Sequence, residues 1–505
     1  MLLHHDFEGW VARHADRVAL VCGQERHTYG DLARRAQSIA AALRRRGVRR
    51  GDRVALFLDN GVEFVAGMVA TLTLGAVFMP INPSTKDDKL AYMLGDARVC
   101  ALLTHESLAQ VWGPAVASSP SVRSVFVAGH AGGAGTAVLP WPAPGADSLA
   151  DPDSIDQDLA AIIYTSGSTG FPKGVMLTHL NMVSAARSVS TYLGLRSDDV
   201  ILCALPLSFD YGLYQVLMAF RLGASVVLER NFSFPVKVLE TMERERATVF
   251  PGVPTMFSML MALANLAAFD LSALRIITNT AAALSEAHIQ RLRALFPQAT
   301  LFSMYGLTEC KRVTYLPPEQ LDIRPTSVGR GMPNEEVWLV DDQGLRLPNG
   351  ATGELVIRGS HVMRGYWEKP EETAARLKPG PIPGEMVLYS GDLFRTDSDG
   401  WLYFLARRDD IIKSRGEKVS PREVENAISS LEGVFEVAVV GVPDEILGQA
   451  VKAFVTLAPD ASLSARDVIR HCLAHLENFM VPKYVEFVES LPKTGTGKIK
   501  KTGLA

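Results

Sequence analysis

Short apolar runs alternate with longer segments of helical periodicity through most of this chain. Seven runs rich in aliphatic and aromatic residues are Val54–Leu58, Val77–Met79, Ala101–Thr104, Val125–Val127, Val226–Leu228, Val249–Pro251 and Arg275–Thr278. Buried strands that alternate with helices are typical of helix-covered parallel sheets. We therefore predict an α/β fold with layered sheets. The Gly-, Ala- and Pro-rich segment Ala128–Asp153 predicts a loose surface connection.

The pattern changes after Val337. From there to Phe404 the predicted strands are short and separated by glycine-containing turns, which indicates a β-rich subdomain. Beyond Arg407–Asp410 the chain has an α+β order of its own, so we predict a large N-terminal domain at 1–408 and a small C-terminal domain at 409–505. In the smaller domain we expect a hairpin around Gly416, helices from Pro421 and Ser464, and strands at Val434–Val442, Ala450–Leu457 and Tyr484–Val488.

Composition narrows the class of protein. With 48% hydrophobic residues, 21% charged residues and a formal net charge of −4, the chain gives no general reason to expect nucleic acid or an anionic membrane as partner. The uncharged run between Glu63 and Lys86 contains glycines and prolines, which predicts a buried helix and strand, not a membrane span. The five scattered cysteines lack metal-ligand spacing, so free thiols in a cytoplasmic protein are expected.

A hydroxyl-rich segment follows the apolar run Leu159–Tyr164. It reads Thr165-Ser-Gly-Ser-Thr-Gly-Phe-Pro-Lys173 and combines two glycines with four hydroxyl side chains. Glycine permits close backbone approach, hydroxyl and N–H groups can surround phosphate oxygens, and Lys173 adds positive charge. A flexible surface turn is the alternative. The Walker pattern and the dinucleotide fingerprint do not fit, because Lys173 follows a proline and Val175–Thr178 is predicted as a strand.

This segment resembles the phosphate signature of the adenylate-forming superfamily, which includes acyl- and aryl-CoA ligases, luciferases and the adenylation domains of peptide synthetases. The resemblance covers nearly the whole chain and implies that the C-terminal domain is a mobile lid. It also implies a catalytic role for Lys173. The nucleotide contacts that it implies in this loop are Thr165, Ser166, Gly167, Ser168, Thr169 and Gly170.

A second motif, Met304–Cys310, is similar to the superfamily's Tyr-Gly-x-Thr-Glu sequence. By that likeness Tyr305 and Gly306 contact the nucleotide and Thr308 contacts the α-phosphate. Glu309 would then hold Mg²⁺ on the phosphates, where the metal neutralises their charge.

Three further segments extend the resemblance. Tyr389–Leu393 resembles the superfamily's Gly-Asp motif, which implies that Asp392 accepts hydrogen bonds from a ribose; a turn-capping aspartate is the alternative. Arg407–Lys413 is similar to the hinge signature, with Ala406 in place of its glycine. By that likeness Arg407 contacts the nucleotide and Asp409 is the hinge.

Near the end of the chain, Leu491–Ile499 matches the Pro-Lys-Thr-x-x-Gly-Lys pattern, which implies that Lys498 is the catalytic lysine. A solvated basic tail is the alternative. Ala282 and Ala283 lie where relatives have an adenine-lining strand, although this chain departs from their usual glycine-rich version.

The predicted acid pocket begins at Leu205–Gly212, where many CoA ligases carry a gate residue; here that residue is Phe209. Asp210 lies among apolar and aromatic neighbours, and an ionised carboxylate there needs a partner. In amino-acid-activating relatives an aspartate at a Phe-Asp step pairs with the substrate amine, so an amine-bearing acid such as anthranilate or an amino acid is expected. The alternative is that Asp210 caps the following helix. The other predicted pocket residues are Tyr211, Phe250, Gly252, Thr278 and Asn279.

The resemblance implies a two-step, AMP-forming ligase that uses ATP, Mg²⁺ and coenzyme A. Arg415–Pro421 is similar to the corresponding segment of acyl-CoA ligases, so Ser414, Arg415 and Gly416 are expected beside coenzyme A. One alternative is a ligase that loads the phosphopantetheine arm of a carrier protein. Others are an ATPase or phosphotransferase acting at the γ-phosphate, and a non-catalytic nucleotide-binding module.

Overall fold

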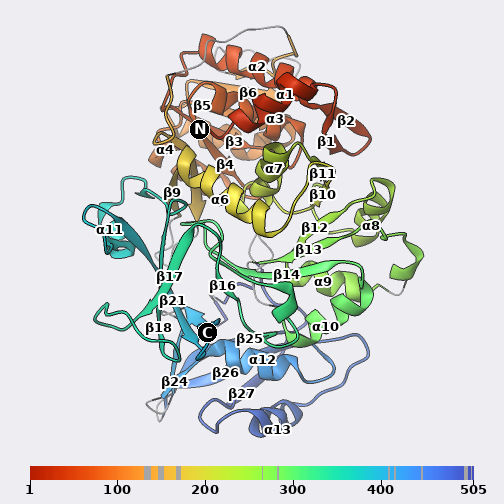
Figure 1. Ribbon diagram of the computed structural model, residues 1–505, viewed down its shortest axis with the longest axis vertical. Helices are drawn as coiled ribbons and strands as arrows, with labels where there is room; N and C mark the ends of the chain where they lie inside the picture. Colours follow the sequence, from red (N-terminus) through yellow and green to blue (C-terminus); the bar gives the residue numbers. More distant parts are fainter. Residues whose placement is uncertain are drawn as a thin grey trace.

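Two large sheets and their covering helices form the N-terminal part of the molecule (Figure 1). The computed structural model describes residues 1–129, 138–145, 153–165, 172–263, 265–280, 284–407, 410–414, 417–444, 447–493, 499–501 and 503–504. The predicted α/β class, with a β-rich subdomain and a small α+β C-terminal part, is confirmed.

The first large sheet has nine strands within the described ranges. Their spatial order is β16 (Arg330–Gly331), β15 (Thr314–Leu316), β14 (Thr300–Tyr305), β13 (Ile276–Asn279), β12 (Val249–Gly252), β10 (Val200–Cys203), β11 (Ser225–Leu228), β1 (Val18–Cys22) and β2 (Glu25–Thr28). The six strands from β14 to β1 are parallel, and antiparallel strands close both ends. The N-terminal strand β1 therefore lies far along the chain from its neighbour β11.

The second large sheet has eight described strands. Their order is β19 (Gly365–Tyr366), β9 (Lys173–Thr178), β8 (Leu159–Thr165), β4 (Val77–Ile81), β3 (Arg53–Phe57), β5 (Ala101–His105), β6 (Ser124–Ala128) and β7 (Val138–Pro140). Strand β7 corrects the prediction of a loose connection through Ala128–Asp153, because Val138–Pro140 pairs in parallel with β6. The short run Val138-Leu-Pro was too brief to stand out between flanking Gly and Pro residues.

Thirteen α-helices occur in the described ranges. They are α1 (His5–His14), α2 (Tyr29–Arg45), α3 (Val62–Thr73), α4 (Asp87–Asp96), α5 (Ala109–Ala117), α6 (His179–Tyr192), α7 (Asp210–Leu222), α8 (Pro235–Arg244), α9 (Pro254–Met261), α10 (Glu286–Leu295), α11 (Pro370–Arg376), α12 (Pro421–Ser429) and α13 (Ala465–His475). The uncharged run before Lys86 forms the buried helix α3 and the buried strand β4, as predicted. None of the helices that the structure describes has both the length and the apolar character needed to cross a membrane.

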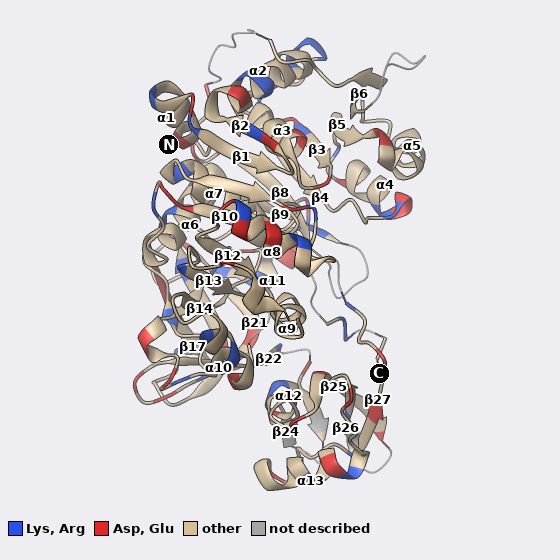
Figure 2. Cartoon of the chain, turned by 90° about the vertical axis from the view of Figure 1, so that its right-hand side faces the viewer, with Lys and Arg blue, Asp and Glu red and all other residues tan. Residues whose placement is uncertain are grey.

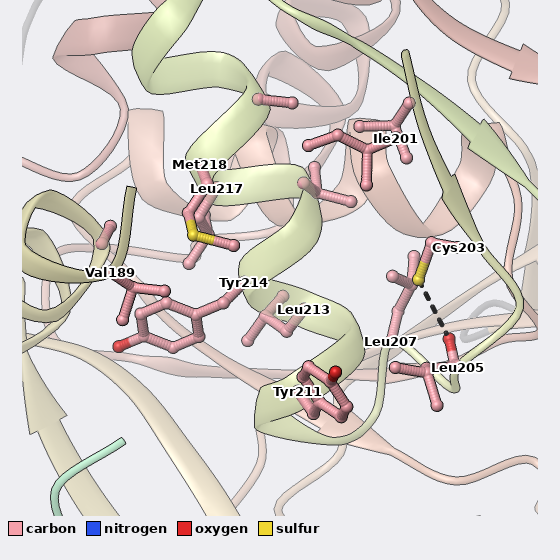
Figure 3. Packing of buried hydrophobic residues seen from close by; sticks show 14 of the residues in the cluster. Val189, Ile201, Cys203, Leu205, Leu207, Tyr211, Leu213, Tyr214, Leu217 and Met218 are labelled. Atoms are coloured by element: carbon pink, nitrogen blue, oxygen red, sulfur yellow. Dashed lines mark hydrogen bonds between the residues drawn. The ribbon is translucent and has the colours of Figure 1, made fainter. Parts of the chain in front are cut away.

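Helix α7 is central to the largest hydrophobic core (Figure 3). Almost all of its side chains are buried, among them Leu213, Tyr214 and Leu217. Gly212 lets its first turn approach the preceding loop, since a Cβ there would lie 2.3 Å from the carbonyl oxygen of Pro206. The start of α7 is thereby fixed against the strand ends of the nine-stranded sheet.

Two five-stranded sheets complete the fold. The antiparallel subdomain contains β17 (Glu335–Val340), β18 (Thr352–Gly359), β20 (Leu377–Pro379), β21 (Met386–Thr396) and β22 (Leu402–Arg407). The C-terminal part contains β23 (Ile412–Ser414), β24 (Glu417–Val419), β25 (Val434–Asp444), β26 (Gly448–Leu457) and β27 (Tyr484–Phe487). This part has its own hydrophobic cluster and lies at one end of the molecule (Figure 2). The exact domain boundary at residues 408 and 409 stays a prediction.

Candidate active site

The hydroxyl-rich segment joins the two strands of a hairpin. Strands β8 and β9 are antiparallel, and their register places Thr165 opposite Lys173 at the end of the pair where the connecting segment begins and ends. Residues 166–171 between them lie outside the described residues, and with them the predicted contacts of Ser166, Gly167, Ser168, Thr169 and Gly170. The Lys173 ammonium lies 5.6 Å from the ring centroid of Tyr366, which is on the neighbouring strand β19.

Glu309 reaches the same place from the other large sheet. It lies in the loop between β14 and β15, and the Tyr366 hydroxyl donates a hydrogen bond of 2.8 Å to its Oε1. The backbone N–H of Met363 donates to the Glu309 carbonyl at 2.7 Å. Thr308 precedes it in the same turn and is half-buried. Lys173 and Glu309, 136 positions apart in the sequence, therefore both contact one tyrosine, Lys173 its ring and Glu309 its hydroxyl.

Asp392 is held by two neighbours. The Tyr305 hydroxyl donates to its Oδ2 at 2.5 Å, and the register of β21 and β22 puts Asp392 opposite Arg407, whose Nε lies 3.8 Å from Oδ1. Burial raises the pKa of Asp392, while the positive charge of Arg407 opposes that rise. Only 6% of Asp392 is exposed, so it is not a solvated turn-capping residue.

We call the group formed by Lys173, Tyr305, Glu309, Tyr366 and Asp392 the carboxylate cluster. Its two carboxylates each accept a hydrogen bond from a neutral tyrosine, and a neutral partner does not cancel the negative charge of a carboxylate. Burial raises the pKa of both tyrosines, which keeps the phenols protonated. Carboxylate oxygens suit Mg²⁺ and ribose hydroxyls, so this set fits a magnesium nucleotide chemically.

Tyr366 and Arg376 belong to this region but were not predicted. Arg376 ends α11 and lies directly beside Gly391, where a Cβ would fall 1.8 Å from its Nη1. Its charge lowers the pKa of Asp392. The sequence contains no motif around either residue. The pairing of β19 with β9 brings Tyr366 beside Lys173, and the backbone hydrogen bond from Met363 joins the same segment to Glu309.

The predicted acid-pocket residues converge around the start of α7. The Tyr211 hydroxyl lies 2.8 Å from both the carbonyl oxygen and Oγ1 of Thr278. The rings of Phe250 and Phe257 meet edge to face at 6.1 Å. Gly252 leaves room for that contact, because a Cβ there would lie 2.5 Å from the Phe257 ring.

The two remaining predicted pocket residues, Asn279 and Phe209, lie at the end of β13 and just before α7. Asn279 is buried at the end of β13, and Phe209 is half-buried immediately before α7.

Asp210 has a partner within the chain. Its Oδ2 lies 3.2 Å from the Nζ of Lys311, whose side chain is only 2% exposed. The requirement for a partner is confirmed. The alternative that Asp210 caps the helix is wrong, because α7 begins at Asp210 and its N-cap position is Phe209. A sequence window around Asp210 could not show this pair, since Lys311 is 101 positions away.

Lys311 is followed by a second buried cation, Arg312. We call Asp210, Tyr211, Tyr214, Lys311 and Arg312 the cation cluster. Lys311 lies 4.7 Å from the Tyr214 ring centroid and Arg312 lies 4.9 Å from that of Tyr211. Burial lowers the pKa of Lys311 to about 7, although the Asp210 carboxylate raises it. Neither cation was predicted; the only signal was two consecutive charges between the apolar residues Cys310 and Val313.

Several predicted residues lie outside the described residues: Ala282, Ala283, Asp409, Arg415, Gly416 and Lys498. Ser414 is described and is buried in β23, opposite Gly448 of β26. The predicted contacts of Ser414 with coenzyme A remain untested.

The molecule combines two helix-covered sheets, a β-rich subdomain and a small α+β part, and the carboxylate cluster lies where they meet. This is the architecture of an adenylate-forming enzyme. Residues 7–367 match the AMP-binding enzyme family, and residues 423–498 match the AMP-binding enzyme C-terminal domain. The chain therefore belongs to the AMP-binding enzyme family of the adenylate-forming superfamily.

Individual relatives agree with this membership. The chain is 31% identical to a long-chain-fatty-acid–CoA ligase of Escherichia coli O6:H1, over 99% of this chain and 93% of that protein. It is 34% identical to a feruloyl-CoA synthase of Amycolatopsis sp., over 94% of this chain and 92% of that one. A solved structure of the anthranilate CoA ligase AuaEII with anthranoyl-AMP has a TM-score of 0.92 and 29% identity, and covers 100% of this chain and 96% of that one.

The chain is thus an AMP-forming acid–thiol ligase of the acyl- and aryl-CoA synthetase type. Enzymes of this type use ATP, Mg²⁺ and coenzyme A.

Proposed function

We propose that this enzyme activates a small carboxylic acid as its acyl-adenylate and transfers the acyl group to the thiol of coenzyme A. In the first half-reaction the acid's carboxylate oxygen attacks the α-phosphorus of ATP and pyrophosphate leaves. In the second, a thiolate attacks the acyl carbon and AMP leaves. The observation that carries the proposal is the meeting of Lys173, Glu309 and Asp392, from two sheets and the subdomain, around one site.

Each member of the carboxylate cluster has a role in this proposal. Asp392 accepts hydrogen bonds from the ribose hydroxyls, and Arg407 beside it adds a positive charge. Lys173 contributes charge to the phosphates, and Glu309 is a ligand for Mg²⁺. The metal, when bound, neutralises phosphate charge that would otherwise repel the incoming carboxylate.

The C-terminal part supplies the remaining groups in the proposal. Lys498 would stabilise the negative charge that develops as the carboxylate attacks phosphorus. Rotation about Asp409 would then withdraw Lys498 and bring Ser414, Arg415 and Gly416 beside coenzyme A. The separate hydrophobic cluster of this part supports its movement as one body.

The anthranilate-like, amine-bearing acid remains a prediction with one observation for it and one against. The solved relative AuaEII is an anthranilate CoA ligase. However, the Lys311 ammonium lies against Asp210, where the hypothesis places a substrate amine. Comparing anthranilate with benzoate, in the wild type and in Asp210→Ala, tests whether Asp210 binds a substrate amine or only pairs with Lys311. An amine-selective site predicts that Asp210→Ala reduces activity on anthranilate far more than on benzoate.

ATP–pyrophosphate exchange across a panel of aryl, amino, aliphatic and dicarboxylic acids tests the function. We expect acid-dependent exchange and AMP as the product. ADP as the product would instead establish an ATPase or phosphotransferase, and no turnover with any acid would indicate a binding module.

Supplying coenzyme A and a phosphopantetheinylated carrier protein in separate reactions identifies the acceptor. We expect a thioester with coenzyme A. Transfer only to the carrier protein would contradict the proposed acceptor while leaving the adenylation step intact. A cytoplasmic location also stays a prediction.

A further inference from the structure

The loop between β14 and β15 turns two long cationic side chains into the protein. Lys311 has φ of 35° and Arg312 has φ of 61°, a left-handed region that residues with a Cβ seldom adopt. The loop is tight because Gly306 contacts it directly; a Cβ on Gly306 would lie 2.7 Å from the Arg312 Cα. Two consecutive residues in this conformation are typical of functional sites, where strain is retained for a purpose.

The two buried cations of this loop differ in whether a described carboxylate pairs with them directly. Lys311 is matched by Asp210 at 3.2 Å. Arg312 is 2% exposed, yet no described residue accepts a hydrogen bond from its Nε or Nη1. None of the ion pairs recorded among the described residues includes Arg312. A guanidinium stays protonated in proteins, and a buried charge is costly unless an opposite charge or acceptor satisfies it.

The unmatched guanidinium lies beside the predicted acid pocket. It stacks on Tyr211, and the hydroxyl of that tyrosine is bound to Thr278. The backbone of Arg312 contacts Gly306, which follows Tyr305 of the carboxylate cluster. Arg312 therefore lies between the residue that follows Tyr305 and the first turn of α7, while Asp210 is already engaged by Lys311.

We propose that Arg312 determines substrate specificity by binding a second anionic group of the acid. This inference rests on the proposed function. The substrate class is then small dicarboxylic acids, or acids of similar size that carry another anionic substituent. One carboxylate reacts at the α-phosphorus, and the other accepts hydrogen bonds from the Arg312 guanidinium. Lys311, fixed by Asp210, holds the loop conformation and adds to the positive potential.

The test compares matched acids in ATP–pyrophosphate exchange: glutarate with pentanoate, and phthalate with benzoate. With the wild-type enzyme we expect kcat/KM to favour at least one dicarboxylate by about tenfold or more over its monocarboxylate partner, since a buried polar group discriminates against analogues that leave it unsatisfied. Preference for the monocarboxylate in both pairs would overturn the proposal without need of any variant.

Variants of Arg312 assign the preference to this residue. In Arg312→Leu the dicarboxylate should lose about tenfold or more in kcat/KM while the monocarboxylate changes by less than about threefold, and Arg312→Lys should recover part of the loss. Arg330→Leu is the matched control, because Arg330 also stacks on an aromatic ring, Trp401, but is exposed. Equal losses for both kinds of acid in Arg312→Leu would contradict a selective role.

The outcomes separate this proposal from the function on which it rests. Exchange with monocarboxylates alone would retain the ligase and overturn the role of Arg312. Exchange with no acid in the panel would overturn both. Because the wild-type comparison is independent of the variants, a folding defect in Arg312→Leu, detected by its thermal unfolding midpoint, would not remove the test.

Discussion

The carboxylate cluster and the cation cluster share one loop but are paired in different ways. In the carboxylate cluster, Glu309 and Asp392 accept hydrogen bonds from tyrosines that remain neutral, and Asp392 also lies 3.8 Å from the Nε of Arg407. In the cation cluster, one of two buried cations is matched by Asp210 and the other has unsatisfied donors. This difference supports the proposal that the carboxylate cluster binds a metal and a ribose, whereas the cation cluster binds an anion.

The largest expected effect tests the catalytic role proposed for Lys498, which lies outside both clusters. Lys498→Ala should lower the rate of adenylate formation by about 10²–10³-fold or more, because it removes the charge that we propose stabilises the developing negative charge. Thioester formation from pre-made acyl-AMP should be largely spared. Single-turnover assays of the two half-reactions measure this, with Lys500→Ala as the neighbouring control. Equal loss of both half-reactions would contradict the assigned role.

Breaking the one matched pair of the cation cluster should cost stability. Lys311→Met leaves the partly buried Asp210 without its recorded ion-pair partner, and we expect the free energy of unfolding to fall by about 3 kcal/mol. Adding Asp210→Asn should restore part of that loss, because the carboxylate charge that Lys311 had balanced is then also removed. Urea denaturation of the wild type, the two single variants and the double variant measures the coupling. Additive losses would show that the pair contributes no coupling energy.

The same pair predicts a pH dependence. Burial lowers the pKa of Lys311 in the folded protein to about 7, whereas an unfolded lysine keeps a pKa near the ordinary value of 10.5. Between these values the unfolded state binds the extra proton, so this group makes unfolding less favourable as pH rises, by at most about 1.4 kcal/mol per pH unit. The difference in unfolding free energy between wild type and Lys311→Met should therefore grow from pH 7 towards pH 10. A constant difference would show that Lys311 stays protonated.

Asp392→Asn tests whether Asp392 binds the ribose of the nucleotide. Loss of the charged acceptor should raise the KM for ATP by about 10- to 100-fold, because hydrogen bonds to charged groups contribute about 1.5–3 kcal/mol. Exchange assays at varied ATP measure it. Asp399→Asn, on the same subdomain but mostly exposed, is the control. An unchanged KM for ATP would assign Asp392 to structure alone.

Tyr366→Phe should have the smallest effect. It removes one hydrogen bond to Glu309 and keeps the ring beside Lys173, so a decrease of about fivefold in kcat/KM for ATP is expected, corresponding to about 1 kcal/mol. Varying Mg²⁺ in the same assay should show a weaker apparent affinity for the metal. A loss as large as that of Asp392→Asn would mean that the phenol itself contacts the substrate.

Sequence reasoning located most strands because their signals are local. The buried runs that became β3, β5, β6 and β11 were apolar and bounded by polar residues. Strand β7 was missed because three residues between glycine- and proline-rich flanks give too little periodicity. The N-terminal strand β1 pairs with β11 across about 200 residues, and β2 pairs with β1; neither strand had a local signal for its place in that sheet.

The candidate site divides along the same line. Motif resemblance singled out Glu309, Asp392 and Lys173, and the structure brings them together. Resemblance could not find Tyr366 or Arg376, which reach the cluster only through strand pairing and the position of α11. The resemblance also predicted Asp210 as a pocket residue but did not identify its partner, because Lys311 is contributed by another loop.

The amino-acid sequence by itself determined the order of elements, the α/β class and the polar motifs at their ends, since each depends on residues close together in the chain. The tertiary structure decided which charges meet. Whether a buried ion is matched depends on distances of a few ångströms between segments far apart in sequence, and those distances are fixed only when the sheets and helices pack.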